Sequence, residues 1–310
     1  MRNKNEIEII RHSIMNQLEI FLVEMISRGP HGHEDLEIGI ILEGTVNIFL
    51  DRESYILKQG DIFVINRFQI HSFLRTTEKN RILAFQIHPD FYRHINPSLG
   101  FLRFENNIIH SGSLHRGLIE RLQSCAKDYF IGTLDTQIRC SSELLSALSV
   151  LLSQSFYSIS SEQESTSVQN NSMRLDRMMK YIGEHYMEHL TLNELASIEH
   201  ISSYHASHFI KKMLGISFQD YLNQVRFEHA LHLFENTGLT AIDVCLEVGF
   251  SSTRYLNQMF VKNFSCTYKE YIKAEKKPHL SDVTLPTDNI QHKYSFIQSR
   301  LLLEKTEESS

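Results

Sequence analysis

Short apolar runs separated by turn-forming residues fill much of the first 90 residues. The runs are 18–25, 36–42, 46–50, 62–65 and 81–87. Many of their residues are β-branched, and Gly44, Asp51 and Gly60 stand between the runs. Runs of this kind, bounded by Gly and Asp, are typical of β-strands. Many short strands at close spacing predict an antiparallel barrel or sandwich.

The apolar spacing changes over residues 113–157 and becomes helical. It predicts two helices, broken near Gly132. The positions that set the helical period are Leu114, Leu118, Leu122, Leu144, Leu145, Leu148, Leu151 and Leu152. Two interpretations of the leucine-rich side of the second helix stay open. Either it packs against the barrel, or it forms the seam of a homodimer.

An almost purely polar stretch follows at 158–172. Such a stretch buries too little apolar surface to offset the entropy of ordering, so it predicts a flexible linker. We therefore expect an N-terminal domain over 1–157 and a helical domain over 173–275. The remaining tail, 276–310, has no predicted role, although a short helix is expected over 294–304.

The helical domain contains an internal repeat. The segment 215–221 (GISFQDY) matches 265–271 (SCTYKEY) at an offset of 50 residues. Each copy has the same predicted order of parts: a short helix, a tight turn and a second helix. The predicted ranges are 192–198, 199–201 and 203–213 in the first copy, and 241–248, 249–250 and 252–263 in the second. This order is typical of a helix-turn-helix unit, whose second helix enters the major groove of DNA.

The turn residues support this interpretation. Gly249 fits a left-handed turn because it carries no Cβ. Ser202 and Ser251 can each cap the helix that follows by accepting from its free N–H groups. Small residues at Ala196 and Cys245 allow the two helices of each unit to approach closely.

Periodicity divides the second helices into a buried and an outward side. The buried stripes are Ala206, Phe209, Ile210 and Met213 in the first copy, and Leu256, Met259 and Phe260 in the second. The outward residues are Tyr204, Ser207, His208 and Lys211, then Arg254, Asn257, Gln258 and Val261. A polar outward side can be an ordinary solvated face, but its recurrence behind two capped turns favours DNA reading.

The outward side chains suit the edges of bases. Arg254 can donate twice to guanine, and Asn257 or Gln258 can pair with adenine. Lys211, Lys212 and Lys262 can hold phosphates without reading sequence. The net charge is −6, so the attraction to DNA must come from a local surface.

The spacing between the copies also fits DNA. Residues 218–235 predict one helix of about 27 Å. A helix of that length can hold two reading helices near successive major grooves, which lie about 34 Å apart.

These residues resemble the AraC/XylS family of bacterial transcription regulators over about 100 residues, 174–273. The matching motifs are LTLNELA (190–196), SHFIKKMLGISFQDYLNQVRFEHALHLF (207–234) and AIDVCLEVGFSSTRYLNQMF (241–260). The resemblance implies that Tyr204, Ser207, His208, Arg254, Asn257 and Gln258 read bases. The family usually has Arg in place of His208 and Gln258, and Gly and Pro in place of Ser265 and Tyr268. The departures at His208 and Gln258 leave open which bases these residues recognise. The departures at Ser265 and Tyr268 adjust a turn.

The N-terminal half resembles the cupin-like sensor barrel of that family. The motif is His31-x-His33-x3-Glu37-x6-Gly44, followed by a weaker motif from Gly60 to His71. Asn66 and Phe68 replace the expected Pro and Gly there. The fold class is therefore α+β: an antiparallel β-barrel with a helical pair, then an all-α domain with two helix-turn-helix units joined by a long helix.

His31, His33, Glu37 and His71 converge in such a barrel, and three interpretations stay open. They contact an organic effector, which we favour; they bind a divalent metal; or they only hydrogen-bond one another. Metal does the chemistry in catalytic cupins, so a metal-dependent enzyme fused to a DNA-binding domain is a rival hypothesis. The weakened second motif argues against it, and we expect no enzyme activity and no cofactor.

The resemblance further implies a transcription activator that responds to a small molecule such as a carbohydrate. A regulator without a ligand, controlled by its abundance or by a protein partner, is the remaining alternative. The expected partners are double-stranded DNA, RNA polymerase and a second copy of the chain. Four cysteines without a CxxC pair and the absence of a long apolar stretch lead us to expect a cytoplasmic protein away from membranes.

Overall fold

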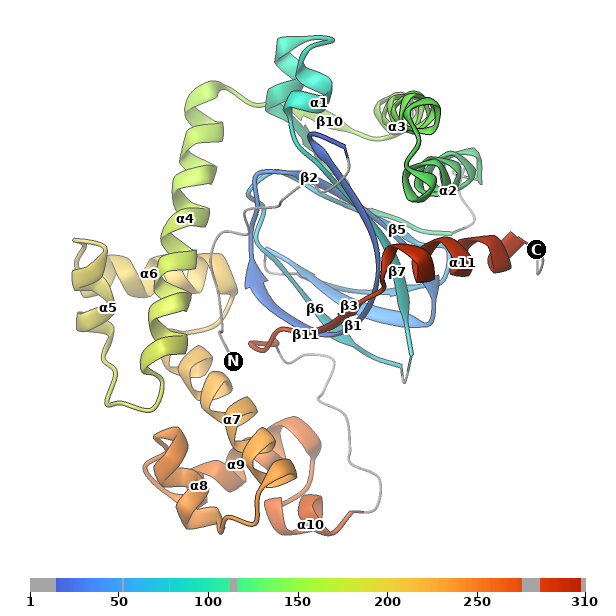
Figure 1. The fold of residues 1–310 in the computed structure, drawn as a ribbon. Helices are drawn as coiled ribbons and strands as arrows, with labels where there is room; N and C mark the ends of the chain where they lie inside the picture. Colours follow the sequence, from blue (N-terminus) through green and yellow to red (C-terminus); the bar gives the residue numbers. More distant parts are fainter. Residues whose placement is uncertain (1–14, 52, 78, 112–115, 275–284, 308–310) are drawn as a thin grey trace.

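The computed structural model describes residues 15–51, 53–77, 79–111, 116–274 and 285–307. A curled antiparallel sheet forms the N-terminal part, and helices form the C-terminal part (Figure 1). The last described segment returns from the helical part to the sheet. The predicted α+β fold class is confirmed, with the barrel present as a sheet that curls around an interior.

Nine strands of the described residues make up the curled sheet. They are β1 (Leu18–His31), β2 (Leu36–Glu43), β3 (Thr45–Leu50), β4 (Glu53–Lys58), β5 (Ile62–Ile65), β6 (His71–Arg75), β7 (Arg81–Ile87), β9 (Ile108–Ile109) and β11 (Ile290–Lys293). Their order is β4-β3-β6-β1-β7-β2-β5-β9, and β11 pairs with β1. The five strands predicted from apolar runs are all present, whereas β4, β6, β9 and β11 were not predicted as strands.

Successive residues of each strand point to opposite faces of the sheet, and both faces are apolar. On β1, Leu18, Ile20 and Leu22 belong to the core between the sheet and the helices that cover it, which we call the outer core. Val23 and Met25 belong to the core inside the curled sheet, which we call the inner core. The same alternation continues on β2, β5 and β7. Apolar residues at nearly every strand position are therefore needed to fill both sides.

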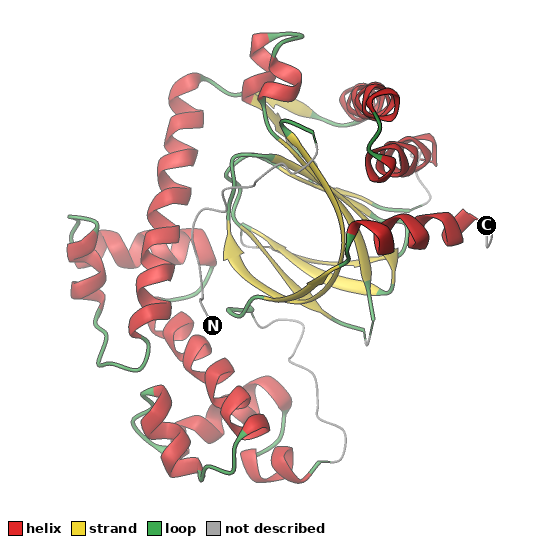
Figure 2. Ribbon diagram, in the orientation of Figure 1, coloured by secondary structure: helices red, strands yellow, loops and turns green. Residues whose placement is uncertain are grey.

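Helices cover the outer face (Figure 2). They are α2 (Arg116–Ile131), α3 (Leu134–Gln154) and α11 (Phe296–Glu307), and Gly132 makes the turn between α2 and α3 with φ +74°. The leucines Leu144, Leu148 and Leu151 are buried in the outer core. The sheet-packing interpretation of this side is confirmed, and dimerisation stays a prediction.

The flexible linker predicted over 158–172 is wrong. Short strands β8 (Leu102–Phe104) and β10 (Tyr157–Ile159) pair, and helix α4 (Glu162–His185) begins directly afterwards. Ser161 and Glu164 form a capping box that starts α4. Composition alone missed the helix because its first turns are solvated and its apolar side begins only near Leu175. A short helix α1 (Asp90–Arg93) and a 3₁₀ turn η1 (Pro97–Phe101) precede β8.

Six further helices complete the C-terminal part. They are α5 (Leu192–Ile198), α6 (Ser203–Leu214), α7 (Phe218–Asn236), α8 (Ala241–Val248), α9 (Thr253–Phe264) and α10 (Tyr268–Lys273). Helix α7 lies between the two repeat copies. Its first half, including Tyr221 and Leu222, packs with α5 and α6, and its second half, including Phe227 and Ala230, packs with α8 and α9.

The tail joins the helical part to the sheet. The helix predicted over 294–304 is present as α11, whose Phe296 contacts Tyr129 and Phe130 of α2. Ahead of β11, the backbone N–H of Asp288 donates to the Glu228 carboxylate of α7 at 2.7 Å. The carbonyl of the same Asp288 accepts from the Gly29 N–H of β1 at 3.1 Å.

Glu228 is buried and accepts several hydrogen bonds from the tail. The Thr287 N–H lies 3.0 Å from each carboxylate oxygen, and Gln224 also donates. Burial and the charge of Asp288 raise the pKa of Glu228 to about 8. The tail is thus held to the helical part through one buried carboxyl group.

We expect Glu228→Ala to lower the free energy of unfolding by about 2–4 kcal/mol, because the partly buried N–H groups of Thr287 and Asp288 lose their acceptor. Urea unfolding of the full chain measures this, with Glu247→Ala on the exposed side of α8 as the control. An equal, small effect of both substitutions would contradict the role given to Glu228.

Candidate DNA-reading surface and sheet-interior site

The two helix-turn-helix units are built from matching local signals. Thr191 and Thr240 start the first helices through capping boxes with Glu194 and Asp243. The turn is closed in each copy by one backbone bond, Ile201 N–H to Ala196 O at 3.0 Å and Phe250 N–H to Cys245 O at 2.9 Å. Buried small residues at these positions let the turn pack closely, as predicted.

The second helices are also capped by serine. The hydroxyl of Ser202 accepts from the His205 N–H, and that of Ser252 accepts from the Tyr255 N–H. The prediction that Ser251 is the second cap is wrong by one residue. Thr253 is the first helical residue, so the adjacent Ser252 occupies the capping position.

Left-handed residues mark the ends of matching helices. Gly249 has φ +78° in the second unit, and His200 has φ +53° at the corresponding turn of the first. Gly215 and Ser265 both cap their helices with φ near +77° and +55°. The Gly-to-Ser departure at 265 therefore keeps the left-handed turn.

The predicted reading sides are exposed. Tyr204, with 70% of its surface exposed, stands beside exposed Ser207 and His208 on α6. Arg254 and Gln258 are exposed on α9. The predicted buried stripes are buried or half-buried against the core of each unit.

Asn257 differs from the other predicted base-reading residues. It is half-buried, and its Oδ1 accepts from the Tyr268 N–H at 3.1 Å, which joins α9 to the start of α10. Its carbonyl is thus engaged within the fold, and base reading by Asn257 stays a prediction that concerns its amide donors. Lys211, Lys212 and Lys262 lie in exposed positions on the last turns of α6 and α9.

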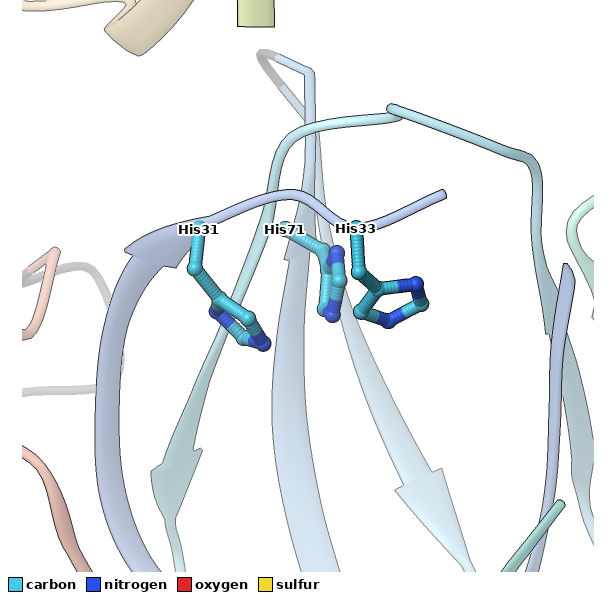
Figure 3. Close-up of side chains that lie close together, drawn as sticks. All are labelled: His31, His33 and His71. Atoms are coloured by element: carbon cyan, nitrogen blue, oxygen red, sulfur yellow. The ribbon is translucent and has the colours of Figure 1, made fainter. Parts of the chain in front are cut away.

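Strand pairing brings the four predicted sensor residues together. His31, at the end of β1, is the register partner of His71, at the start of β6. Their ring centroids are 4.0 Å apart, and the His33 ring lies 5.2 Å from that of His71. Figure 3 shows the three rings pointing in one direction from the rim of the sheet.

Backbone carbonyls orient all three imidazoles. The Nδ1 atoms of His31, His33 and His71 lie 2.9 Å from the carbonyl oxygens of Gly29, Asp35 and Gln69, respectively. A carbonyl only accepts, so each Nδ1 carries a proton. Each Nε2 is thereby directed away from the backbone and toward the interior.

The Nε2 atoms meet different partners. That of His33 lies 2.9 Å from Glu37 Oε2, and that of His31 accepts from Arg28 Nε at 2.7 Å. The Nε2 of His71 is buried and has no hydrogen-bond partner. One nitrogen lone pair of the site is therefore unused.

Burial and neighbouring groups set the charges of the titratable side chains in the histidine site. Burial lowers the pKa of His71 to about 3 and, together with Arg28, lowers the pKa of His31 well below its usual value. Burial opposes ionisation of Glu37, but bonds from His33 and Gln86 and the charge of His33 outweigh it and lower the pKa of Glu37 to about 2. The site thus combines two neutral imidazoles, those of His31 and His71, with a charged pair formed by His33 and Glu37.

Arg28 and Gln86 belong to this site but were missed by sequence reasoning. Gln86 is the register partner of Glu37 across β2 and β7 and donates to it at 3.0 Å. Strand register cannot be read from separate apolar runs, although the alternation of β7 places Gln86 on the inner face. Arg28 carried no motif signal.

The space beside the site is small. A cavity of about 10 Å³ is lined by Arg28, His31 and Glu37 together with apolar side chains that include Phe63 and Phe73. That volume is close to the minimum that holds one water. Phe63 and Phe73 fill the inner core, whereas Phe49 lies on the opposite face of its strand.

The chain matches two family models. A model described as an AraC-like ligand binding domain matches residues 24–126, and a helix-turn-helix domain model matches residues 195–274. The first match covers the histidine site, and the second covers both α6 and α9. No helix within the described ranges is long and apolar enough to cross a membrane.

Several known proteins are similar to this chain. An uncharacterized HTH-type transcriptional regulator of Staphylococcus aureus is 25% identical over 274 residues, covering 86% of this chain and 35% of that protein. The HTH-type transcriptional activator RhaS of Enterobacter sp. is 26% identical over 103 residues, 33% of this chain and 37% of RhaS. ToxT of Vibrio cholerae, 12% identical, aligns over 83% of this chain and 98% of ToxT with a TM-score of 0.37. The chain spans about a third of the length of the first of these relatives.

The second turn provides a matched test of the geometry. A Cβ on Gly249 would lie 2.5 Å from the Met187 carbonyl oxygen, whereas a Cβ on Gly215 meets no atom within 4 Å. Both residues have positive φ. We expect Gly215→Ala to cost about 1–2 kcal/mol and Gly249→Ala about 2–5 kcal/mol of unfolding free energy. Equal losses in urea unfolding would show that the contact with Met187 does not constrain the turn.

Proposed function

Because this chain belongs to the AraC family of helix-turn-helix transcription regulators, we propose that it binds specific DNA and activates transcription in response to an effector in its curled sheet. The observation that carries the proposal is the pair of exposed polar sides on α6 and α9, held by one shared helix. This arrangement lets one chain address two successive major grooves.

Base reading is proposed for Tyr204, Ser207, His208, Arg254 and Gln258, with Asn257 contributing its amide donors. The guanidinium of Arg254 offers two parallel donors, which suit the O6 and N7 of guanine. The lysines Lys211, Lys212 and Lys262 supply contacts to phosphate, which position the protein and carry no sequence information.

The effector role belongs to His31, His33, Glu37 and His71. These residues lie in the segment that matches the ligand-binding model. A carbohydrate effector stays a prediction. Pockets for organic ligands have volumes of about 300–1,000 Å³, so the interior of the sheet must open before a sugar can enter. RNA polymerase and a second copy of the chain are the proposed protein partners.

The test of activation starts from DNA selected by the full chain out of a random-sequence pool. Transcription from a promoter carrying the selected sequence is measured with purified RNA polymerase, with and without the protein. Increased transcript supports activation. Binding without increased transcript would contradict the activator role, and failure to select any sequence would contradict the proposed function.

Arg254→Ala separates base reading from phosphate contact. We expect it to weaken binding to the selected DNA by about 1–3 kcal/mol and to relax the preference at one base pair. Competition binding with single-base variants of the selected site measures both effects. An equal loss on every sequence would show that Arg254 does not read a base.

The matched control is Lys211→Ala on α6. It should weaken binding to all sequences about equally. It should also reduce the slope of the logarithm of the binding constant against the logarithm of the salt concentration by about one, because one counterion fewer is released from the DNA. A loss confined to one base pair would instead assign Lys211 to base reading.

A further inference from the structure

The unused Nε2 of His71 distinguishes the histidine site from an ordinary polar core. Buried polar atoms are normally satisfied, and one that lacks a partner requires an explanation. His71 is 1% exposed, and its ring already donates through Nδ1 to Gln69 O. The ring that carries this lone pair lies between the rings of His31 and His33 (Figure 3).

The orientation of the three rings suits metal coordination. Ligating histidines usually donate their other ring N–H to a carbonyl or carboxylate, which fixes the tautomer and aims the free nitrogen at the ion. All three rings here are held in that way by backbone carbonyls. One ligand atom from each of His31, His33 and His71 lies within 4.8 Å of the others. Coordination at about 2.1 Å places the ligand nitrogens about 3.4 Å from one another, so their separations must shrink by up to about 1.4 Å.

The size of the space selects among ligands. The cavity beside the site holds about 10 Å³, which is too small for an organic molecule but sufficient for an ion. Imidazole nitrogen favours zinc, iron, nickel and copper over calcium or magnesium. The neighbouring Glu37 carboxylate supplies negative charge to the same space.

From these observations, and resting on the proposed regulatory function, we propose that the effector is a divalent transition-metal ion held by His31, His33 and His71 beside Glu37. The ion replaces Arg28 as the partner of His31 Nε2 and takes the Nε2 of His33 from Glu37. His33 releases the proton that it shares with Glu37 to solvent when it binds the ion.

The site lies directly on the contact with the helical part. Gly32, between two of the ligands, packs so closely against α4 that a Cβ on it would lie 2.5 Å from Ser172 Oγ. Ile70, which precedes the third ligand, belongs to the core formed by Leu175, Met178 and the first helix-turn-helix unit. Closing the rings around an ion therefore moves the surface on which α4 is seated.

Cobalt(II) titration of the full, metal-free chain tests the site. We expect one equivalent of Co²⁺ to bind and to give visible ligand-field absorption, with at least tenfold weaker binding in His71→Ala and in His31→Gln. His94→Ala, on an exposed histidine outside the site, should bind as the unchanged chain does. Circular dichroism identifies folded variants, and the two site variants provide independent tests. Absence of binding, or binding that survives in a folded site variant, overturns the proposal.

Zn²⁺ tests the coupling to DNA. We expect saturating Zn²⁺ to change the affinity of the full chain for its selected DNA by about 5-fold to 150-fold. Gly32→Ala should bind Co²⁺ but lose most of this change, whereas Gly183→Ala, which places a Cβ in open space on α4, should keep it. Unchanged DNA affinity with bound Zn²⁺ overturns the effector role.

The two proposals fail in different ways. Sequence-specific DNA binding without Co²⁺ binding would overturn the metal proposal and leave the proposed regulator intact. Co²⁺ binding without sequence-specific DNA binding would overturn the regulatory function and, with it, the role of the ion as an effector.

Discussion

Helix α7 is the constraint on which the arrangement of the C-terminal part depends. One half of the helix completes the core of the first helix-turn-helix unit, and the other half completes the core of the second. This explains why α7 buries polar residues such as Asn223 and Gln224 as well as apolar ones. Because both units pack against the same helix, α7, packing fixes the separation and the relative rotation of α6 and α9. Arg226 adds to this by donating to the Tyr186 and Glu188 carbonyls, which lie just beyond the end of α4.

The curled sheet and the helical part are connected at several places near the histidine site. Gly32 and Ile70 contact the α4 side, and Gly29, two residues before His31, donates to the tail at Asp288 and Asn289. The tail in turn reaches α7 through Glu228. The rim of the sheet is therefore connected to the helix-turn-helix units by two sets of contacts, one through α4 and one through the tail. Packed contacts of this kind transmit displacement because protein interiors have little free volume.

Sequence reasoning succeeded where the signal was local. The bounds of α5 and α8, the left-handed Gly249 and the cap at Ser202 follow from residues within one or two turns of each other. The convergence of His31, His33, Glu37 and His71 followed from a family motif. The helix over 162–172 was missed because a polar, solvated helix start has the composition of a linker, and only its capping box distinguishes it. The pairing of Asn257 with Tyr268 was also missed, because it depends on how α10 returns to α9.

The sequence by itself determined the two repeated units, the faces of their second helices and the residue types at the histidine site, since periodicity, caps and turn residues act over short distances. Only the tertiary structure decided the strand register that sets Glu37 opposite Gln86, the unused nitrogen of His71 and the return of the tail to β1. These features join residues far apart in the chain. They are selected by the simultaneous packing of both faces of the sheet, which no single segment encodes.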